Sequence, residues 1–267
     1  MWNNRSDISG NWVLRCSCAT CCGDRDQNED NLRFGSLIEV TAPVGPLRAE
    51  VSMWMDQTQV FCVCDGIGGS ARGELASRQA LRALSRFLRK NDVRHLPMEE
   101  LAAAAAEAAH SSVLNAYRSL GISGGCTMVM VILQGNRYTM LNIGDSPAFH
   151  YDAATRKFTQ LSVEHSLHWL SQTTGTPCPP GEEHRLAYFL GREGAMARDM
   201  LHITVGTMGD GDAIMLCSDG VTNGIPERKR KKYVKQGRSA AYLVEKASGL
   251  PGADNCTAIC LYARRLK

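Results

Sequence analysis

The stretch from Phe61 to Ser77 constrains the fold of this chain more than any other. It begins with an apolar, β-prone run that ends on Asp65, continues with four glycines within eight residues, and then takes on helical spacing. Glycine tolerates positive φ and lets other groups approach the backbone, so this order predicts a buried strand, a tight loop and a helix start. An ordinary strand–turn–helix has the same pattern, and the Lys-Ser/Thr that completes a nucleotide-binding P-loop is absent. Acidic residues at other strand ends would decide between these interpretations.

Such residues recur along the chain. An aspartate lies at an end of four apolar, strand-like runs: Asp65, Asp145, Asp219 and Asp254. A polar loop, residues 23–31, adds the adjacent carboxylates Glu29 and Asp30, with Arg25 four residues before Glu29. Clustered carboxylates raise one another's pKa, and cations relieve the repulsion. Oxygen ligands without His or Cys beside them favour Mg²⁺ or Mn²⁺ over Zn²⁺.

This set of residues predicts metal-assisted hydrolysis of a phosphoester. Two such ions about 4 Å apart would activate a water molecule and hold a phosphoryl oxygen. Arg25 would bind the phosphate through bidentate hydrogen bonds. The alternative for residues 23–31 taken alone is a solvated turn.

Short motifs around these acids also occur in a recognisable order. They are Arg25-(x)₂-Asn28-Glu29-Asp30, Asp65-Gly66-Ile67-Gly68-Gly69, Gly73-Glu74-Leu75-Ala76-Ser77, Gly125-Cys126-Thr127, Asn142-Ile143-Gly144-Asp145-Ser146, Glu164-His165-Ser166, Leu216-Cys217-Ser218-Asp219-Gly220-Val221 and Asp254-Asn255-Cys256-Thr257. On these motifs, over about residues 12–263, the chain resembles the metal-dependent Ser/Thr protein phosphatases of the PPM, or type 2C, family. Ile67 stands where many eukaryotic members have a histidine, and this makes the chain similar to bacterial members.

The resemblance implies an α+β fold with a central antiparallel β-sandwich flanked by helix pairs on both sides, in four αββα layers. It implies a single phosphatase domain over residues 1–267, in which a variable flap, about residues 162–205, borders the site. Composition agrees with one large domain, although 267 residues also allow two small ones.

The resemblance also implies residue roles. Asp65 would bridge two Mg²⁺ or Mn²⁺ ions, with the Gly66 carbonyl on one of them, and Arg25 and Asp65 are the candidate catalytic residues. The remaining candidate metal ligands are Asp219 and Asp254 at the first ion, Glu29 and Asp30 at the second, and Asp145 at a third, weaker one. Pro147 replaces the family's usual arginine and Glu164 its usual aspartate, both outside the core ligand set.

The expected partners follow from the same resemblance and from composition. Phosphorylated protein substrates are implied, with a Ser/Thr kinase as the opposing enzyme, and we expect a monomer. The net charge of +3 is too small to indicate nucleic acid. No apolar run approaches the ~18 residues that span a membrane, and the first residues do not form a signal peptide, so we expect a cytoplasmic protein.

Periodicity predicts the elements. We expect strands at 11–22, within 32–59 around a turn at 43–46, and at 60–64, 127–133, 138–143, 149–151, 158–161, 212–217 and 256–263, and helices at 71–90, 97–120, 226–248 and, briefly, 185–190.

Four alternatives stay open. A catalytically weak member would act as a regulatory binding module, and an acyl or thiol hydrolase would use His165 with a serine or cysteine, although no Gly-x-Ser-x-Gly elbow is present. Cys16, Cys18, Cys21 and Cys22 could bind zinc, but alternate side chains of one strand point to opposite faces. The basic run 228–232 is either a solvated helix face or a docking site for an acidic partner.

Overall fold

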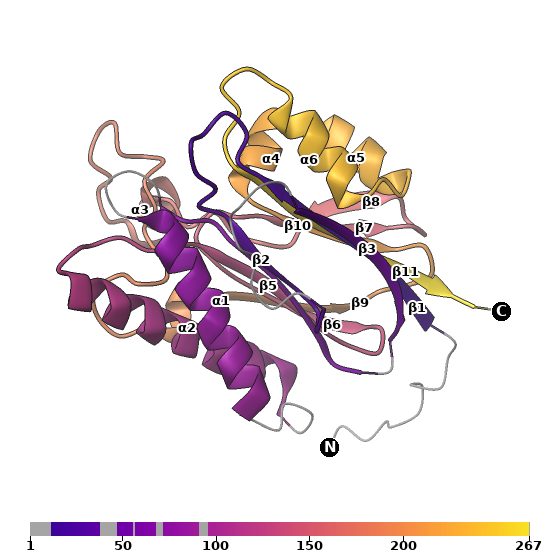
Figure 1. Cartoon of the computed structure of the whole chain (residues 1–267), viewed down its shortest axis with the longest axis horizontal. Coiled ribbons are helices and arrows are strands. Elements are labelled where there is room, and N and C mark those ends of the chain that lie inside the picture. Colours follow the sequence, from indigo (N-terminus) through magenta and orange to yellow (C-terminus); the bar gives the residue numbers. More distant parts are fainter. Residues whose placement is uncertain (1–11, 38–46, 56, 68–71, 91–95, 267) are drawn as a thin grey trace.

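The computed structural model describes residues 12–37, 47–55, 57–67, 72–90 and 96–266 (Figure 1). The turn predicted at 43–46, and the glycines at 68 and 69, lie outside these residues. Within the described ranges, no helix combines the length and apolar character needed to cross a lipid bilayer.

Two antiparallel sheets form the centre of the molecule. One has six strands, in the order β3 (Leu47–Trp54), β1 (Trp12–Cys21), β11 (Cys256–Arg265), β10 (Ala213–Cys217), β7 (Ala148–Asp152), β8 (Lys157–Gln160). The other has five, in the order β2 (Asn31–Phe34), β4 (Gln59–Cys64), β5 (Met128–Gln134), β6 (Arg137–Ile143), β9 (His202–Thr207). β5 lies in the middle of its sheet, which explains why its sequence is an uninterrupted apolar run.

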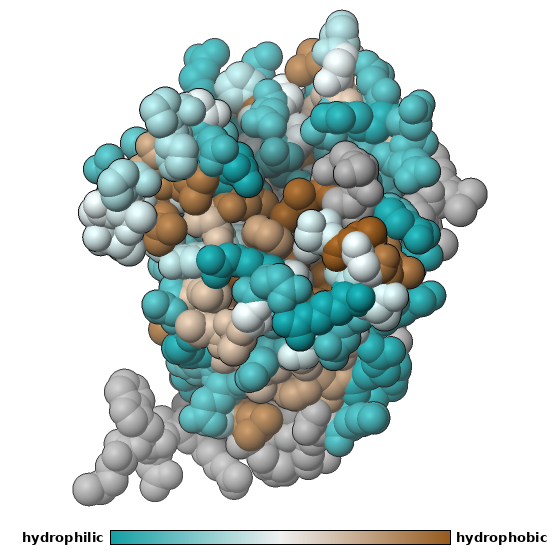
Figure 2. All heavy atoms as spheres, turned by 90° about the vertical axis from the view of Figure 1, so that its left-hand side faces the viewer, coloured by the Kyte–Doolittle hydropathy of each residue, from teal (hydrophilic) through white to brown (hydrophobic). Residues whose placement is uncertain are grey.

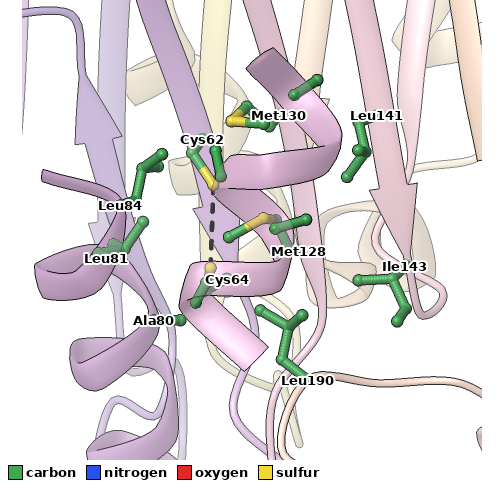
Figure 3. Close-up of a cluster of buried hydrophobic side chains, with 14 of the residues drawn as sticks. Cys62, Cys64, Ala80, Leu81, Leu84, Met128, Met130, Leu141, Ile143 and Leu190 are labelled. Atoms are coloured by element: carbon green, nitrogen blue, oxygen red, sulfur yellow. Dashed lines mark hydrogen bonds between the residues drawn. The ribbon is translucent and has the colours of Figure 1, made fainter. Parts of the chain in front are cut away.

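Helices cover both outer faces (Figure 1). α1 (Gly73–Lys90) and α2 (Met98–Leu120) pack on the five-stranded sheet, whereas α4 (Asp219–Gly224), α5 (Glu227–Lys235) and α6 (Ala240–Ser248) pack on the six-stranded sheet. Three buried clusters separate the four layers, one of them between the two sheets. Figure 3 shows the cluster beneath α1 and α2, where Leu81 and Leu84 of α1 face Cys62 of β4. The predicted α+β sandwich of four layers is therefore confirmed.

The segment between β8 and β9 differs from the prediction. Residues 185–190 are not helical, because their backbone bonds to other segments: Ala187 N–H donates to His165 O, and Leu190 N–H donates to Cys126 O. A helix forms instead at α3 (Leu167–Thr174), where Ser166 Oγ accepts the Trp169 N–H and Gly175 ends the helix in the left-handed conformation. The predicted flap is also too long, since β9 begins at His202.

Two further predictions need correction or refinement. The helical stretch predicted at 226–248 is broken between α5 and α6, where Gly237 has a φ of +65°. Cys16 and Cys18 lie in the core between the sheets, whereas Cys21 packs on the opposite face of β1, so these thiols do not converge on one site.

The basic run on α5 is not uniformly solvated. Arg230 is 9% exposed, and its Nη1 donates to the carbonyls of Ile225 (2.5 Å) and Thr222 (3.1 Å) near the C-terminal end of α4. Its guanidinium also lies over the Phe149 ring. A cation at this position satisfies helix carbonyls that have no partner within α4.

We therefore predict that Arg230→Ala destabilises the protein while Lys229→Ala, on the same helix but exposed, does not. The loss for Arg230→Ala should be about 1–3 kcal/mol, because two buried carbonyls lose their donor. Urea unfolding of both variants checks this difference. Equal losses of unfolding free energy in the two variants would show that the basic run 228–232 affects stability only through its overall charge.

Candidate active site

The acids predicted from the sequence line one cleft. It has a volume of about 520 Å³, and its walls include Arg25, Glu29, Asp65, Gly66, Asp145, Asp219 and Asp254. The strand ends that carry these residues lie on the left-hand side of Figure 1, and Figure 2 views that side, where hydrophobic and hydrophilic side chains lie next to each other. Asp30 is 1% exposed and lies behind the cleft wall.

Asp65 follows β4 and is held by its backbone. Its N–H donates to Thr127 Oγ1 (3.0 Å), and its carbonyl accepts the Thr127 N–H (2.8 Å). Thr127 Oγ1 is in turn 2.6 Å from Ser146 Oγ, next to Asp145. These bonds bring the ends of β4 and β6 together, and leave the Asp65 carboxylate facing the cleft.

Gly66 makes the close packing of this loop possible. A Cβ at Gly66 would lie 2.4 Å from backbone atoms of Gly73 and 2.8 Å from the Glu29 carbonyl. The residue after Asp65 must therefore be glycine for the acid loop, the Asp-Gly turn and the start of α1 to meet. The Glu29 side chain lies against Gly73, the first residue of α1, since a Cβ at Gly73 would be 3.0 Å from the Glu29 carboxyl carbon.

Asp30 is fixed by the opposite sheet. Its Oδ2 accepts the Ser218 hydroxyl (2.7 Å), and Ser218 immediately precedes Asp219. The other oxygen, Oδ1, is buried without a hydrogen-bond partner among the described residues. A buried carboxylate oxygen without a donor is costly unless a cation or a proton satisfies it.

Arg25 and Asp254 form an ion pair at the mouth of the cleft. Arg25 Nη2 is 2.8 Å from Asp254 Oδ2, and the two side chains are 62% and 40% exposed. Exposed pairs of this kind contribute little to stability, so both groups can exchange partners. Asp254 Oδ1 accepts the Asn255 N–H, and Asp219 Oδ2 accepts from Asn223.

His165 supports the loop that carries Asp145. Its Nδ1 accepts the Gly144 N–H (3.2 Å), and its ring contacts those of Trp169 and Tyr188. Burial, aided by His202, lowers the pKa of His165 to about 4, so the ring is neutral and can accept this bond. The bond goes to the backbone and not to a serine or cysteine, which gives no support to a hydrolase with a His165-activated nucleophile.

The electrostatics of the cleft disfavour charge on its acids. Burial, followed by repulsion from Asp30, Asp219, Asp145 and Asp254, raises the pKa of Asp65 well above its usual range. Burial raises the pKa of Asp30 to about 7 and that of Asp145 to about 6. The pKa values of Asp219 and Glu29 are also raised, mainly by burial.

The donor set fits a hard divalent cation. It consists of carboxylate oxygens with no thiol or imidazole among the residues that line the cleft, and this is the ligand chemistry of Mg²⁺ and Mn²⁺. The partnerless Asp30 Oδ1 also calls for positive charge. In the described ranges no three His, Cys, Asp or Glu side chains already form a closed ligand set, because Asp254 turns to Arg25 and Asp30 to Ser218.

Sequence reasoning did not assign a role to the residues that hold the acids. Asn255 is the chief example: its Oδ1 accepts the Glu29 N–H (2.7 Å), and its Nδ2 donates to the carbonyls of Cys22 and Gln27. It thereby ties the acid loop to the start of β11. Asn28 acts similarly, since its Oδ1 accepts the Asp30 N–H. In the sequence, the feature that could have indicated this role is that each asparagine stands next to a candidate metal ligand in its motif.

The residues at which this chain departs from the usual family motifs lie at the edges of the cleft. Ile67 lines it, and its N–H donates to the Gly125 carbonyl. Glu164 is exposed and raises the pKa of Asp145 through its charge. The Pro147 carbonyl accepts the Cys217 N–H, so this residue contributes to the six-stranded sheet.

Known proteins resemble this chain in sequence and in structure. Residues 50–249 match the family model described as Protein phosphatase 2C. The serine/threonine phosphatase Stp of Listeria welshimeri is 31% identical over 218 residues, 76% of this chain and 84% of the relative.

Solved structures share the fold. The catalytic domain of the serine/threonine protein phosphatase PstP, solved with 2 manganese ions, has a TM-score of 0.70 at 23% identity and covers 95% of this chain and 99% of its own. The serine/threonine phosphatase of S. agalactiae has a TM-score of 0.74 at 19% identity, covering 93% and 99%. The chain thus belongs to the protein phosphatase 2C family, the metal-dependent serine/threonine phosphatases, of which it is a bacterial-type member.

Proposed function

We propose that this protein hydrolyses phosphoserine and phosphothreonine in proteins, with Mg²⁺ or Mn²⁺ bound in the acidic cleft. The observation that carries the proposal is the environment of Asp65, a carboxylate at the end of β4 that faces four other aspartates in a cleft of oxygen donors. Membership of the family supports it, as does the printed activity of the Listeria relative.

The proposed ligand assignment uses the acids by position. Asp65 would serve two cations with the Gly66 carbonyl, one held also by Asp219 and Asp254 and the other by Glu29 and Asp30. Asp145, beyond this set, would hold a third. A divalent cation at these carboxylates supplies the positive charge that activates water and stabilises negative charge on the phosphoryl group.

The chain's own residues supply binding and orientation. Arg25 stands at the mouth of the cleft with an exposed guanidinium, which matches two phosphate oxygens in a bidentate arrangement. Thr127 and Ser146 fix the Asp65 and Asp145 loops, and His165 keeps Gly144 in place as a neutral acceptor. The segment between β8 and β9 contributes Leu186 to the cleft wall and is proposed to set substrate choice.

A catalytically weak regulatory module remains the second candidate. The two differ in turnover: the enzyme should hydrolyse a small aryl phosphate with Mn²⁺ and stop when EDTA is added. A folded, Mn²⁺-binding protein without turnover would favour the module.

We further propose that residues 1–267 act as a single phosphatase domain, and that the protein is a cytoplasmic monomer that opposes a Ser/Thr kinase. Support for the kinase comes from the chemistry, since a phosphoserine phosphatase needs an enzyme that makes its substrate.

Asp65→Asn should abolish most activity and also alter stability. Loss of the central carboxylate should reduce Mn²⁺-dependent aryl phosphate turnover by about a hundredfold or more. In EDTA the variant should unfold at a higher temperature than the wild type, because one repelling, desolvated charge is removed. Asp26→Asn, also in the cleft wall but outside the acid cluster, is the matched control. Near-normal rates at saturating Mn²⁺ would contradict the assignment.

Stability of the metal-free protein should fall as pH rises from 6 to 8. The folded-state pKa of Asp30 is about 7, against an ordinary value of 3.8, so the folded state holds a proton that the unfolded state has released. The stabilisation from this proton is therefore fully present below the pKa of Asp30 in the unfolded state, and it is lost as the pH rises through the pKa in the folded state. Between pH 6 and 8 the loss for this group is about 1 kcal/mol. Thermal unfolding in EDTA measures this slope.

Two comparisons sharpen the pH test. Asp30→Asn should flatten the slope, because the titrating group is gone. Saturating Mn²⁺ should reverse it, because protons and the cation compete for the same carboxylates. A metal-free wild type that is as stable at pH 8 as at pH 6 would refute the electrostatic description of the cleft.

Arg25→Ala should impair substrate binding more than metal binding. We expect KM for an aryl phosphate to rise about three- to tenfold, since two charge-assisted hydrogen bonds are lost. The exposed pair with Asp254 contributes little, so the free energy of unfolding should change by less than about 0.5 kcal/mol. Arg25→Lys keeps the charge but lacks the planar guanidinium, so its KM should lie between those of the wild type and Arg25→Ala. Unchanged KM and kcat in Arg25→Ala would exclude a role in phosphate binding.

A further inference from the structure

Two cysteines face each other at the base of the cleft loops. Cys21 ends β1 and Cys256 begins β11, and the two residues are directly opposite in the antiparallel register. Both pack on the face of the sheet that α6 covers. Directly opposed residues of an antiparallel pair have Cα separations of about 4.5–5.5 Å, which lies within the range that a disulfide spans.

Cys21 differs in access from the thiols of the buried clusters. Cys62 and Cys64, whose sulfurs are 3.9 Å apart (Figure 3), are both fully buried, as is Cys16. Cys21 is half-exposed and lines a cavity of about 430 Å³ between the β1–β3 edge and α6. A small oxidant can therefore reach Cys21, whereas Cys256 is buried behind it.

The environment of Cys21 also favours the thiolate. The neighbouring Cys256 and Ser248 side chains hold the pKa of the Cys21 thiol well below its usual range. The thiolate is the form that reacts with peroxides.

Cys256 is linked to the candidate metal site. Its Sγ donates to the carbonyl of Asp254 (3.3 Å). On the other strand, the Cys22 carbonyl accepts a hydrogen bond from Asn255 Nδ2. The Oδ1 of the same asparagine accepts the Glu29 N–H. The two sulfurs thus lie directly beneath both loops that carry candidate ligands.

We propose that Cys21 and Cys256 are an oxidation site for hydrogen peroxide or an organic hydroperoxide, and that their disulfide weakens cation binding by the loop that carries Asp254; the second half rests on the proposed function. The Cys21 thiolate attacks the peroxide, an S–O bond forms and the O–O bond breaks, and the departing hydroxide takes up a proton. Cys256 then attacks the Cys21 sulfenic acid, the S–S bond forms, and water leaves with the Cys256 proton. The thiols lose two electrons, which reduce hydrogen peroxide to two waters; with an organic hydroperoxide an alkoxide departs in place of hydroxide, and the products are an alcohol and one water.

The disulfide removes the hydrogen that Cys256 donates to the Asp254 carbonyl. The Asp254 loop therefore loses one of its anchors, and a dithiol reductant restores it.

The test has two independent readouts on the full chain. After peroxide treatment, peptide mapping by mass spectrometry under non-reducing conditions should find a Cys21–Cys256 disulfide that dithiothreitol removes. Calorimetry should find the Mn²⁺ dissociation constant raised at least about threefold, as expected for the loss of one hydrogen bond. Cys21→Ser and Cys256→Ala should keep their Mn²⁺ affinity after peroxide, whereas Cys22→Ser, a neighbouring half-exposed thiol, should respond as the wild type does.

The outcomes separate the two halves. A disulfide at other cysteines, or Cys21 oxidised without pairing, overturns the proposal as a whole, whereas a mapped Cys21–Cys256 disulfide with unchanged Mn²⁺ affinity overturns its second half. Failure of the reduced wild type to bind Mn²⁺ instead overturns the proposed function, and with it the second half, while mapping still decides the first. Should Cys256→Ala unfold, Cys21→Ser alone carries the comparison.

Discussion

The crowding of carboxylates at one end of the sandwich is the constraint on which the rest of this structure depends. Asp65 and Asp30 lie against each other where the two sheets meet, and Asp145, Asp219 and Asp254 surround them. Each raised pKa there records free energy that the folded chain stores by burying these carboxylates and by placing them next to one another. The sandwich must be rigid enough to hold these groups together, and three apolar clusters supply that rigidity.

The polar residues beside the acids show how the repulsion is contained. Neutral side chains, such as Asn255 and Ser218, donate to backbone or carboxylate oxygens around the cleft and leave the charge itself uncompensated. A chain selected for stability alone would place cations or apolar groups here, as natural proteins do away from functional sites. Arg25, the cation among the described residues that line the cleft, is exposed and easily displaced, so it does not neutralise the interior.

The sequence predicted the framework because periodicity and the motifs describe local structure. The apolar run of β5 and the helical spacing of α1 each reflect one element packed on one core, and both were predicted within a few residues. The helix predicted at 185–190 was wrong, because its composition resembles a helix while its backbone bonds to His165 and Cys126, which are distant in sequence. The partners of Asp30 and Glu29 were missed for the same reason: Ser218 and Asn255 lie about two hundred residues away in sequence, and no local pattern reports such pairings.

Long-range pairing also explains why chemistry can gather where it does. β1 and β11, from opposite ends of the chain, are neighbours through ten paired residues, and this ladder brings residue 29 beside residue 255. Gly66 and Gly73 then allow α1 to approach the same point from the other sheet. A covalent or conformational change at this end of the β1–β11 ladder can reach both ligand loops, because Cys256 lies two residues after Asp254 and Asn255 binds both the Cys22 carbonyl and the Glu29 N–H. The position of the cysteine pair is thus a consequence of how the fold builds its acidic cleft.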